Sequence, residues 1–268
     1  DQYLKEIDQQ IPATPPSTFT MEGDQASFTV TPENPERLVG TEVYYSYDSN
    51  ARMRFWKRAE AVNNADTWSV DLSVHDDLPL YVFALCRYRL NEPRQLERGE
   101  TSTFVLNSQE QVWLPEVVER RSLARLVRGD DIFEDFANGA RDWGTRDGRS
   151  LTTYKFQDPS LDRGNDRKLA FTIDPHGKRL VLRLRAESKF LAPADNQGSF
   201  TLTKQVNGDG PQEVVIARED FEGPEGKTLE WAKIGTFQVT LVDVQGKTTL
   251  ELATDSGQEY LRAIRLVD

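Results

Sequence analysis

The spacing of apolar side chains divides the chain into a short helical stretch and two regions of β-sheet. In the first stretch the apolar side chains stand three and four positions apart and make one face of a helix: Leu4, Ile7 and Ile11. Pro12 ends this pattern, and the prolines that follow begin an extended linker. We therefore expect residues 1–17 to form a helix and a linker ahead of the first globular domain.

From residue 18 to residue 107 the apolar side chains recur at every second position, which is the period of a β-strand with one buried face. Clusters of Pro, Asn and Asp separate these segments and supply turns. The expected strands are Ala26–Thr31, Thr41–Tyr47, Met53–Trp56, Thr67–Leu72, Leu80–Arg89 and Thr103–Leu106. Short strands at this density predict an immunoglobulin- or fibronectin-III-like sandwich.

The period of two returns in residues 130–268, after a connector over residues 108–129 in which Pro115 could open a short helix over Glu116–Val127. In Arg179–Ala186 leucines alternate with polar positions, as in an antiparallel strand with one buried face. The absence of strand–helix–strand alternation favours a jelly-roll β-sandwich over a Rossmann fold or a barrel. The expected strands are Ile132–Phe136, Thr153–Phe156, Lys168–Ile173, Arg179–Ala186, Ser199–Lys204, Glu213–Ala217, Phe237–Val242, Thr248–Leu252 and Tyr260–Val267.

The acidic composition narrows the range of partners. The net charge of -11 would repel the phosphates of nucleic acid, so no nucleic-acid partner is expected, and an anionic polysaccharide is disfavoured on the same ground. No apolar run approaches the length needed to cross a bilayer, so no membrane association is expected. The single cysteine, Cys86, excludes an intrachain disulfide and follows an apolar run, where a small buried side chain is expected.

Residues suited to catalysis are scarce. The chain lacks Gly-x-Ser-x-Gly, Gly-x-x-x-x-Gly-Lys-[Ser/Thr], His-Glu-x-x-His and Cys-x-x-Cys, the marks of most nucleophilic, nucleotide-driven and metal-dependent mechanisms. Acidic doublets such as Glu134-Asp135 cannot by themselves form a glycosidase pair, because neighbours on a strand point to opposite faces. His75 and His176 are expected in surface turns. We therefore predict no catalytic residue, no cofactor and no bound metal.

Aromatic side chains are the one feature of the sequence that suits a ligand-binding role. A sugar ring presents an apolar face that packs flat on Trp or Tyr, while its hydroxyls pair with polar side chains. For each aromatic the alternative is burial in the core. Trp143 is the best candidate, because it lies in a polar, glycine-rich segment typical of an exposed loop. The candidate ligand-binding residues are Trp143, Tyr154, Trp231 and Tyr260.

Three segments of the second β-region carry a resemblance to known proteins. They are Phe133–Phe136 with Trp143 following, Val214–Ile216 with Leu229–Gly235, and Tyr260–Leu266. Through them the region resembles jelly-roll carbohydrate-binding modules, of the type that includes the complex I intermediate-associated protein fold, and the C-terminal β-sandwich of certain large bacterial hydrolases. Many such modules hold a structural calcium through an acidic residue of the last strand. The corresponding positions here are Arg262 and Ala263.

The first β-region carries a second resemblance, in Val43–Trp56. This segment is similar to the strand pair that follows the catalytic domain in dienelactone-hydrolase-like and PhoPQ-regulated-type α/β-hydrolases. The resemblance implies a secreted or periplasmic protein with an adjacent α/β-hydrolase domain as a partner. Residue 1 belongs to no signal peptide, so a mature product or an excised piece of a longer chain is expected.

These observations together predict a non-catalytic accessory region that binds a polysaccharide or oligosaccharide. Two alternatives remain open. One is a purely structural β-sandwich spacer that packs on a catalytic domain. The other is a cryptic jelly-roll glycosidase or lyase, which would need a cleft with converging acid and base groups.

Overall fold

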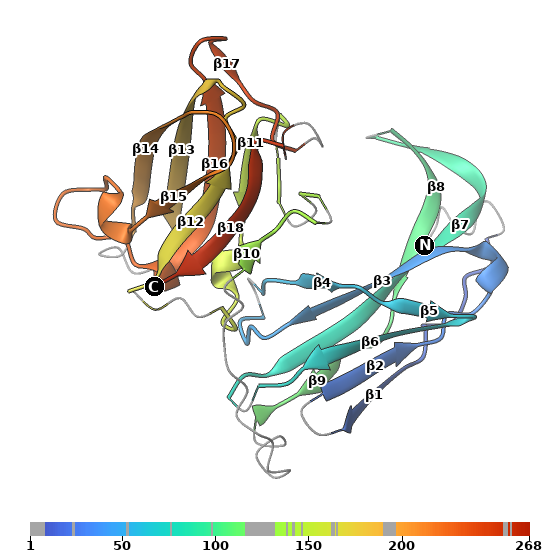
Figure 1. The fold of residues 1–268 in the computed structure, drawn as a ribbon. Helices are drawn as coiled ribbons and strands as arrows, with labels where there is room; N and C mark the ends of the chain where they lie inside the picture. Colours follow the sequence, from blue (N-terminus) through green and yellow to red (C-terminus); the bar gives the residue numbers. More distant parts are fainter. Residues whose placement is uncertain are drawn as a thin grey trace. The chain divides into compact units, whose positions relative to one another are not determined.

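The computed structural model shows an all-β chain built from antiparallel sheets (Figure 1). It describes residues 9–22, 25–51, 54–75, 77–97, 99–115, 132–137, 139–140, 143–145, 147–161, 164, 166–189, 197–253, 257 and 259–268. The chain forms two compact units, Asp1–Val127 and Arg128–Asp268. Most of the expected N-terminal helix and the helix expected over Glu116–Val127 fall outside the described residues, and residues 9–11 are not helical.

The first unit is an immunoglobulin- or fibronectin-III-like sandwich of two sheets. One sheet has the order β1-β2-β6-β5, and the other has the order β4-β3-β7-β8 with β9 also paired to β7. The alternation had not predicted β1, β4, β5 or β9. The elements are β1 Ser17–Glu22, β2 Gln25–Val30, the 3-10 turn η1 Pro35–Arg37, β3 Leu38–Ser46, β4 Lys57–Ala59, β5 Val62–Asn64, β6 Thr67–Ser73, β7 Leu80–Leu96, β8 Gly99–Asn107 and β9 Gln111–Trp113.

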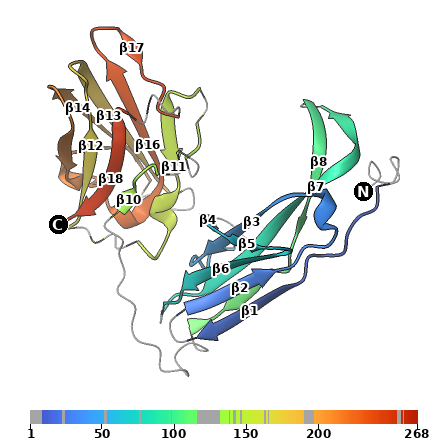
Figure 2. The same ribbon diagram turned by 45° about the vertical axis from the view of Figure 1, so that its right-hand side comes forward.

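Strand β7 is the central strand of the first core. Its inward side chains are fully buried, and they are Leu80, Val82, Ala84, Cys86 and Tyr88. Cys86 is completely buried, which confirms the expected buried small side chain, and this burial raises the pKa of its thiol. Beyond the core, the β7–β8 hairpin extends past the rest of the sandwich (Figures 1 and 2).

His75 does not lie in a surface turn, as its sequence had suggested. The side chain is buried, and its ring packs edge-on against Tyr47 with 4.5 Å between ring centres. The neighbouring Asp and Pro residues indicate a turn, but the imidazole lies inside the unit, where the edge contact with Tyr47 replaces water. His176 does lie in a turn, in the left-handed region at φ 50°, with its side chain 40% exposed.

The second unit has the strand order of a jelly roll (Figure 2). Counting β10 to β16 and β18 in chain order, one sheet runs first-eighth-third-sixth and the other second-seventh-fourth-fifth, with β17 paired to β16. The elements are β10 Ile132–Glu134, β11 Ser150–Thr153, η2 Lys155–Gln157, β12 Lys168–Ile173, β13 Arg179–Ser188, β14 Ser199–Asn207, β15 Gln212–Ile216, η4 Arg218–Asp220, η5 Trp231–Lys233, β16 Ile234–Asp243, β17 Thr248–Thr249 and β18 Leu261–Val267.

Alternation along the strands sets which side chains enter the second core. Leu180, Leu182 and Leu184 of β13 are buried, as their spacing predicts. The strand expected over Thr153–Phe156 is wrong, because β11 ends at Thr153 and a 3-10 turn follows. Only that turn lets Phe156 enter the core.

The free edge of β14 is partly covered by a neighbouring segment of the chain. Thr201 and Glu222 exchange two backbone hydrogen bonds of 2.8 Å, which close an isolated antiparallel bridge. On its other side β14 pairs with β13 along its whole length. Thr201 is therefore hydrogen-bonded through its backbone on one side of the strand while its side chain stays exposed.

Shortening Leu182 to alanine should destabilise the second unit by about 2–5 kcal/mol, because the change leaves a cavity in a closed core. Leu182 is completely buried, whereas its near neighbour Thr203 is exposed. Thr203→Ala is therefore the matched control and should change stability by less than about 0.5 kcal/mol. Urea unfolding followed by tryptophan emission measures both variants. Equal unfolding midpoints would contradict the assignment of Leu182 to the core.

Candidate functional site

The structure does not bring the four aromatic candidates together on one surface. Trp143 is 5% exposed and Trp231 is fully buried, so neither ring offers a free face. Tyr260 is half-buried, and Tyr154 is 50% exposed. The expectation of an exposed platform at Trp143 is therefore wrong, and Tyr154 is the most exposed of the four rings.

Trp143 is buried because its indole N–H finds a carboxylate inside the unit. Nε1 donates a hydrogen bond of 2.8 Å to Glu134 Oε2, and the ring lies 5.9 Å from the ring of Phe136 and 6.3 Å from that of Phe133. A polar, glycine-rich sequence typically forms a loop over the surface. Here the loop folds back over the core, because a buried tryptophan needs one partner for its N–H and Glu134 supplies it.

Glu134 also holds the next part of the chain. Its Oε1 accepts a 2.9 Å hydrogen bond from the backbone N–H of Phe136, and its Oε2 pairs with the ammonium of Lys155. The Glu134 and Lys155 side chains are only 10% and 15% exposed. Because a buried charge is stable only when it is paired and hydrogen-bonded, this carboxylate fixes three segments at once.

Trp231 and Tyr260 have structural partners of their own. The Trp231 indole donates to the carbonyl of Arg167 at 2.7 Å, and its ring stacks on Phe156 with 5.7 Å between centres. Tyr260 accepts a 2.7 Å hydrogen bond from Lys178, whose ammonium also lies 4.9 Å from the centre of the Tyr260 ring. Trp231 is thus a core residue, and Tyr260 is engaged by a neighbouring cation.

A group of charged side chains around Tyr260 braces the turns at one end of the second sandwich. Asp174 is buried and pairs with Arg262 at 2.6 Å. Asp243 accepts hydrogen bonds from the backbone N–H groups of Gly246 and Gln245 at 2.9 and 3.0 Å, and lies 3.6 Å from the Lys178 ammonium. The Gly246 N–H, the Lys178 charge and the Gln245 N–H together lower the pKa of Asp243, against the effect of desolvation. Both carboxylates are thus occupied by partners within the fold.

The sheet β11-β16-β13-β14 presents a polar outer surface. The side chains that point away from the core alternate with buried ones on all four strands. We call this surface the polar face and define it by Ser150, Thr152, Arg179, Arg183, Arg185, Glu187, Ser199, Thr201, Thr203, Thr236, Gln238 and Thr240. It offers hydroxyl, amide and guanidinium groups within one sheet.

Register places these side chains in rows across the strands. Arg183 lies opposite Thr203 on β14 and opposite Thr240 on β16, which in turn lies opposite Ser150. The next row joins Thr201, Arg185, Gln238 and Thr152 in the same way. Directly opposite side chains in an antiparallel sheet stand roughly 5 Å apart, so each row forms a line of polar groups in mutual reach.

Tyr154 extends the polar face at its β11 border. It stands directly between β11 and the 3-10 turn η2, and its side chain is 50% exposed. The next residue, Lys155, turns toward Glu134 instead. Tyr154 is therefore an exposed ring beside a row of polar groups, at the place where the chain leaves the sheet.

Side chains at the end of the polar face are held by one another. Arg185 contacts Glu187 at 2.7 Å and donates through Nε to the Ser199 hydroxyl at 3.2 Å. Glu187 also accepts a 3.3 Å hydrogen bond from the Thr236 hydroxyl. This connected group limits side-chain motion at the row nearest to Tyr154.

Hollows lie along the β14 border of the polar face. One of ≈ 300 Å³ is lined by Glu187 and Ser199 among others, and a second of ≈ 300 Å³ by Thr201, Thr203 and Glu222 among others. Volumes of this size are at the lower end of the range for small-molecule sites. A ligand that lay across the strands would therefore find depressions at this border.

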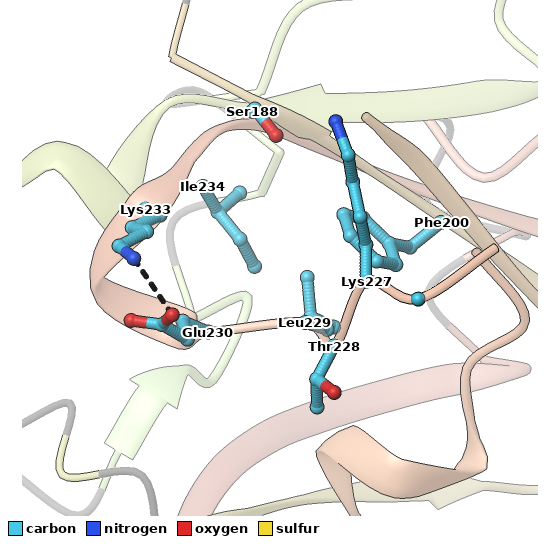
Figure 3. Close-up of a pocket in the computed structure, with 9 residues that line it drawn as sticks. Ser188, Phe200, Lys227, Thr228, Leu229, Glu230, Lys233 and Ile234 are labelled. Atoms are coloured by element: carbon cyan, nitrogen blue, oxygen red, sulfur yellow. Dashed lines mark hydrogen bonds and ion pairs between the residues drawn. The ribbon is translucent and has the colours of Figure 1, made fainter. Parts of the chain in front are cut away.

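A further hollow of ≈ 260 Å³ begins where β13 ends and β16 starts (Figure 3). Leu229, Ile234 and Phe200 supply its apolar wall. Lys227 stands on one side, and the Glu230–Lys233 ion pair of 2.7 Å stands on the other (Figure 3). The Lys227 ammonium donates to the Gln197 carbonyl at 2.5 Å, so its charge is engaged at the rim.

Within the described ranges, no three His, Cys, Asp or Glu side chains come together in a way that could hold a metal ion. The same residues contain no helix with the length and apolar character needed to span a membrane.

Sequence reasoning did not single out the polar face. A signal for it was present, because hydroxyl and amide residues occupy alternate positions from Ser199 to Asn207 on β14. The prediction of binding residues considered aromatic side chains, so it did not include these positions. The surface becomes visible only when the register of four strands, far apart in the chain, is known.

Replacing Glu134 by glutamine should destabilise the second unit by about 3–5 kcal/mol, because Lys155 would remain in a nearly closed site without its counter-charge. Glu225→Gln, at an exposed position, is the control and should have little effect. The double variant Glu134→Leu with Lys155→Met should recover part of the loss. Urea unfolding measures all three. A Glu134→Gln midpoint equal to that of the control would show that the pair does not hold the fold.

Asp243 should make the second unit less stable in acid. Its pKa is lowered in the folded state, so the unfolded chain binds more protons as the pH falls through the range below about 4. The stabilisation is fully present above the unfolded pKa and is lost as the pH falls through the folded pKa. Thermal unfolding of wild type and Asp243→Asn from pH 7 to pH 2.5 measures this. The variant should lose less stability on acidification, and parallel curves would contradict the assignment.

Comparison with known proteins assigns no family. No protein-family model matches the chain, and no curated protein matches its sequence. Within the described part of the chain, the polar face with Tyr154 combines an exposed ring, several kinds of polar group and adjacent hollows.

Proposed function

We propose that the second unit binds a polysaccharide or oligosaccharide on the polar face, as a non-catalytic module. The observation that carries this proposal is the exposed Tyr154 ring at the border of a surface built from hydroxyl, amide and guanidinium side chains. A sugar needs an apolar surface for its ring and hydrogen-bonding groups for its hydroxyls. The polar face offers both on one rigid sheet.

The geometry favours an extended ligand. The rows of the polar face cross four strands, and neighbouring strands lie roughly 4.8 Å apart, so the surface is about 15 Å wide. Side chains on regular strands lose little further freedom on binding, because packing already fixes their backbone. Several sugar units could therefore lie across the strands, with one of them against Tyr154.

The wider setting of this module follows from the sequence resemblance. We propose that the chain belongs to a secreted or periplasmic protein and stands beside an α/β-hydrolase domain, which the module would bring to its substrate. A glycosidase or lyase reading has less support. Glu187 is the one carboxylate among the residues that define the polar face, and it is paired with Arg185, whereas glycoside hydrolysis requires two carboxyls.

A structural role is favoured for the first unit by the outer side of β7. Tyr81, Phe83 and Leu85 alternate with the core residues and remain partly exposed. The Trp56 ring meets Phe83 edge-on at 4.8 Å, and the Arg54 guanidinium lies 3.5 Å from the centre of the Tyr81 ring. Partly exposed apolar side chains in such a group are typical of surfaces that pack on another protein. We propose that the first unit is the spacer of the pair.

Changing Tyr154 to alanine should weaken glycan binding roughly 5- to 150-fold, taking the free energy of a base stacked on an aromatic ring as the scale. Tyr154→Phe keeps the apolar ring face and should retain most of the affinity. Leu96→Ala, at an exposed position of the first unit, controls for non-specific effects. The measurement is affinity electrophoresis and calorimetry against soluble glucans, xylans, mannans and pectic polysaccharides.

The folded state of each variant is checked by near-ultraviolet circular dichroism before binding is compared. Tyr154 lies outside the core, so all three variants should unfold at the wild-type temperature. A wild-type protein that binds no glycan of the panel would refute the proposal. Equal binding by folded Tyr154→Ala and wild type would remove the ring from the site.

A further inference from the structure

The polar face is locally basic, although the chain as a whole is acidic. Strand β13 directs Arg179, Arg183 and Arg185 outward with one carboxylate, Glu187, while Asp220 and Glu222 lie at the β14 border of this surface. All three arginines are exposed. The chain carries a formal net charge of -11, so this line of cations reverses the prevailing sign. A local field of this kind attracts anionic groups to the surface that carries it.

Arg183 stands at the centre of this line without an ion-pair partner among the described residues. Its neighbours in register are Thr203 and Thr240, which carry no charge. Arg185 differs, because its guanidinium already contacts Glu187 and the Ser199 hydroxyl. Arg183 therefore presents all of its donors to an incoming ligand, between two hydroxyl groups.

The chemistry of this arrangement matches a carboxylate. A guanidinium donates two parallel hydrogen bonds to the oxygens of one carboxylate, and such charge-assisted bonds are stronger than those to a neutral hydroxyl. Thr203 and Thr240, directly beside Arg183, can donate or accept further bonds to the ring hydroxyls of the same sugar. A neutral glycan would leave the Arg183 charge without a counter-charge.

Nucleic acid is a poorer match for the same surface. Non-specific single-strand binding relies on several aromatic rings that stack successive bases. The polar face has one exposed ring at its border, Tyr154. A polysaccharide depends less on stacking, because its hydroxyls can pair with the polar side chains of this surface.

We infer that the ligand of the polar face is an acidic polysaccharide with uronic acid units, and that Arg183 binds the uronate carboxylate. This inference rests on the proposed glycan-binding function and specifies its ligand. It also departs from the expectation drawn from net charge, which disfavoured an anionic polysaccharide. The local arrangement of arginines outweighs the average charge, because salt screens distant charges over about 8–10 Å.

The test compares each acidic polymer with a form of the same polymer that carries no charge. Polygalacturonate and alginate serve as probes, each beside its own carboxyl-reduced form, in calorimetry with the full chain. The wild type should bind at least one acidic polymer roughly tenfold or more tightly than the reduced form. Raising sodium chloride from about 50 mM to about 500 mM should weaken that binding, since the contact is exposed.

Arg183→Gln tests the residue itself. The variant should lose the preference for the acidic polymer while it keeps its affinity for the reduced form, because glutamine retains hydrogen bonding without charge. Arg87→Gln, an exposed arginine of the first unit, is the matched control and should behave as wild type. Both variants should unfold at the wild-type temperature, because neither side chain is in a core.

The outcomes separate this inference from the function on which it rests. Equal binding of acidic and reduced polymers, with loss in Tyr154→Ala, would refute the acidic ligand and retain glycan binding. A wild-type preference that Arg183→Gln leaves unchanged would refute the role of Arg183. Binding of polyuridylate at the same site, lost in Arg183→Gln, would overturn the choice of a glycan. Binding of no polymer, acidic or neutral, would refute both proposals.

Discussion

The carboxylate of Glu134 is the contact on which the candidate site depends. It receives the indole N–H of Trp143, the backbone N–H of Phe136 and the ammonium of Lys155, all in a nearly closed environment. Bringing these charges out of water is costly unless every donor and acceptor is matched. The matched group draws Lys155 inward at the end of β11, and the residue before it, Tyr154, is left on the outside. The same turn of the chain thus fixes the buried ion pair of the core and the exposed position of Tyr154 at the border of the proposed ligand-binding surface.

A single strand serves both the core and the proposed site. The leucines of β13 fill the second core, and the arginines between them line the polar face. The period of two makes this division unavoidable, because adjacent side chains must point to opposite sides of the sheet. A slip of one residue in the pairing of β13 would bury the arginines and expose the leucines. The register that stabilises the sandwich is therefore the register that displays the arginines of the proposed site.

Alternation was enough to predict the two sandwiches, because each sheet has one buried and one solvated face. The alternation in Arg179–Ala186 correctly predicts which leucines are buried, and β12 has the bounds that its pattern predicts. Short edge strands such as β4, β5 and β17 have too few residues for a clear period, and they were missed or overextended. Alternation did not predict the burial of individual aromatic side chains either. The sequence predicts an exposed Trp143 and a His75 in a surface turn, yet both side chains are buried. Their partners, Glu134 and Tyr47, come into contact with them only in the folded chain.

The bridge between Thr201 and Glu222 limits edge-to-edge strand pairing between copies of the second unit. A bare edge strand is a template on which another chain can extend the sheet, and such pairing leads to aggregation. The two backbone hydrogen bonds at Thr201, the third residue of β14, occupy one position of this edge, so an incoming strand could not pair along its whole length. The strand can thus carry a row of exposed polar side chains while part of its backbone edge is closed to a neighbouring chain.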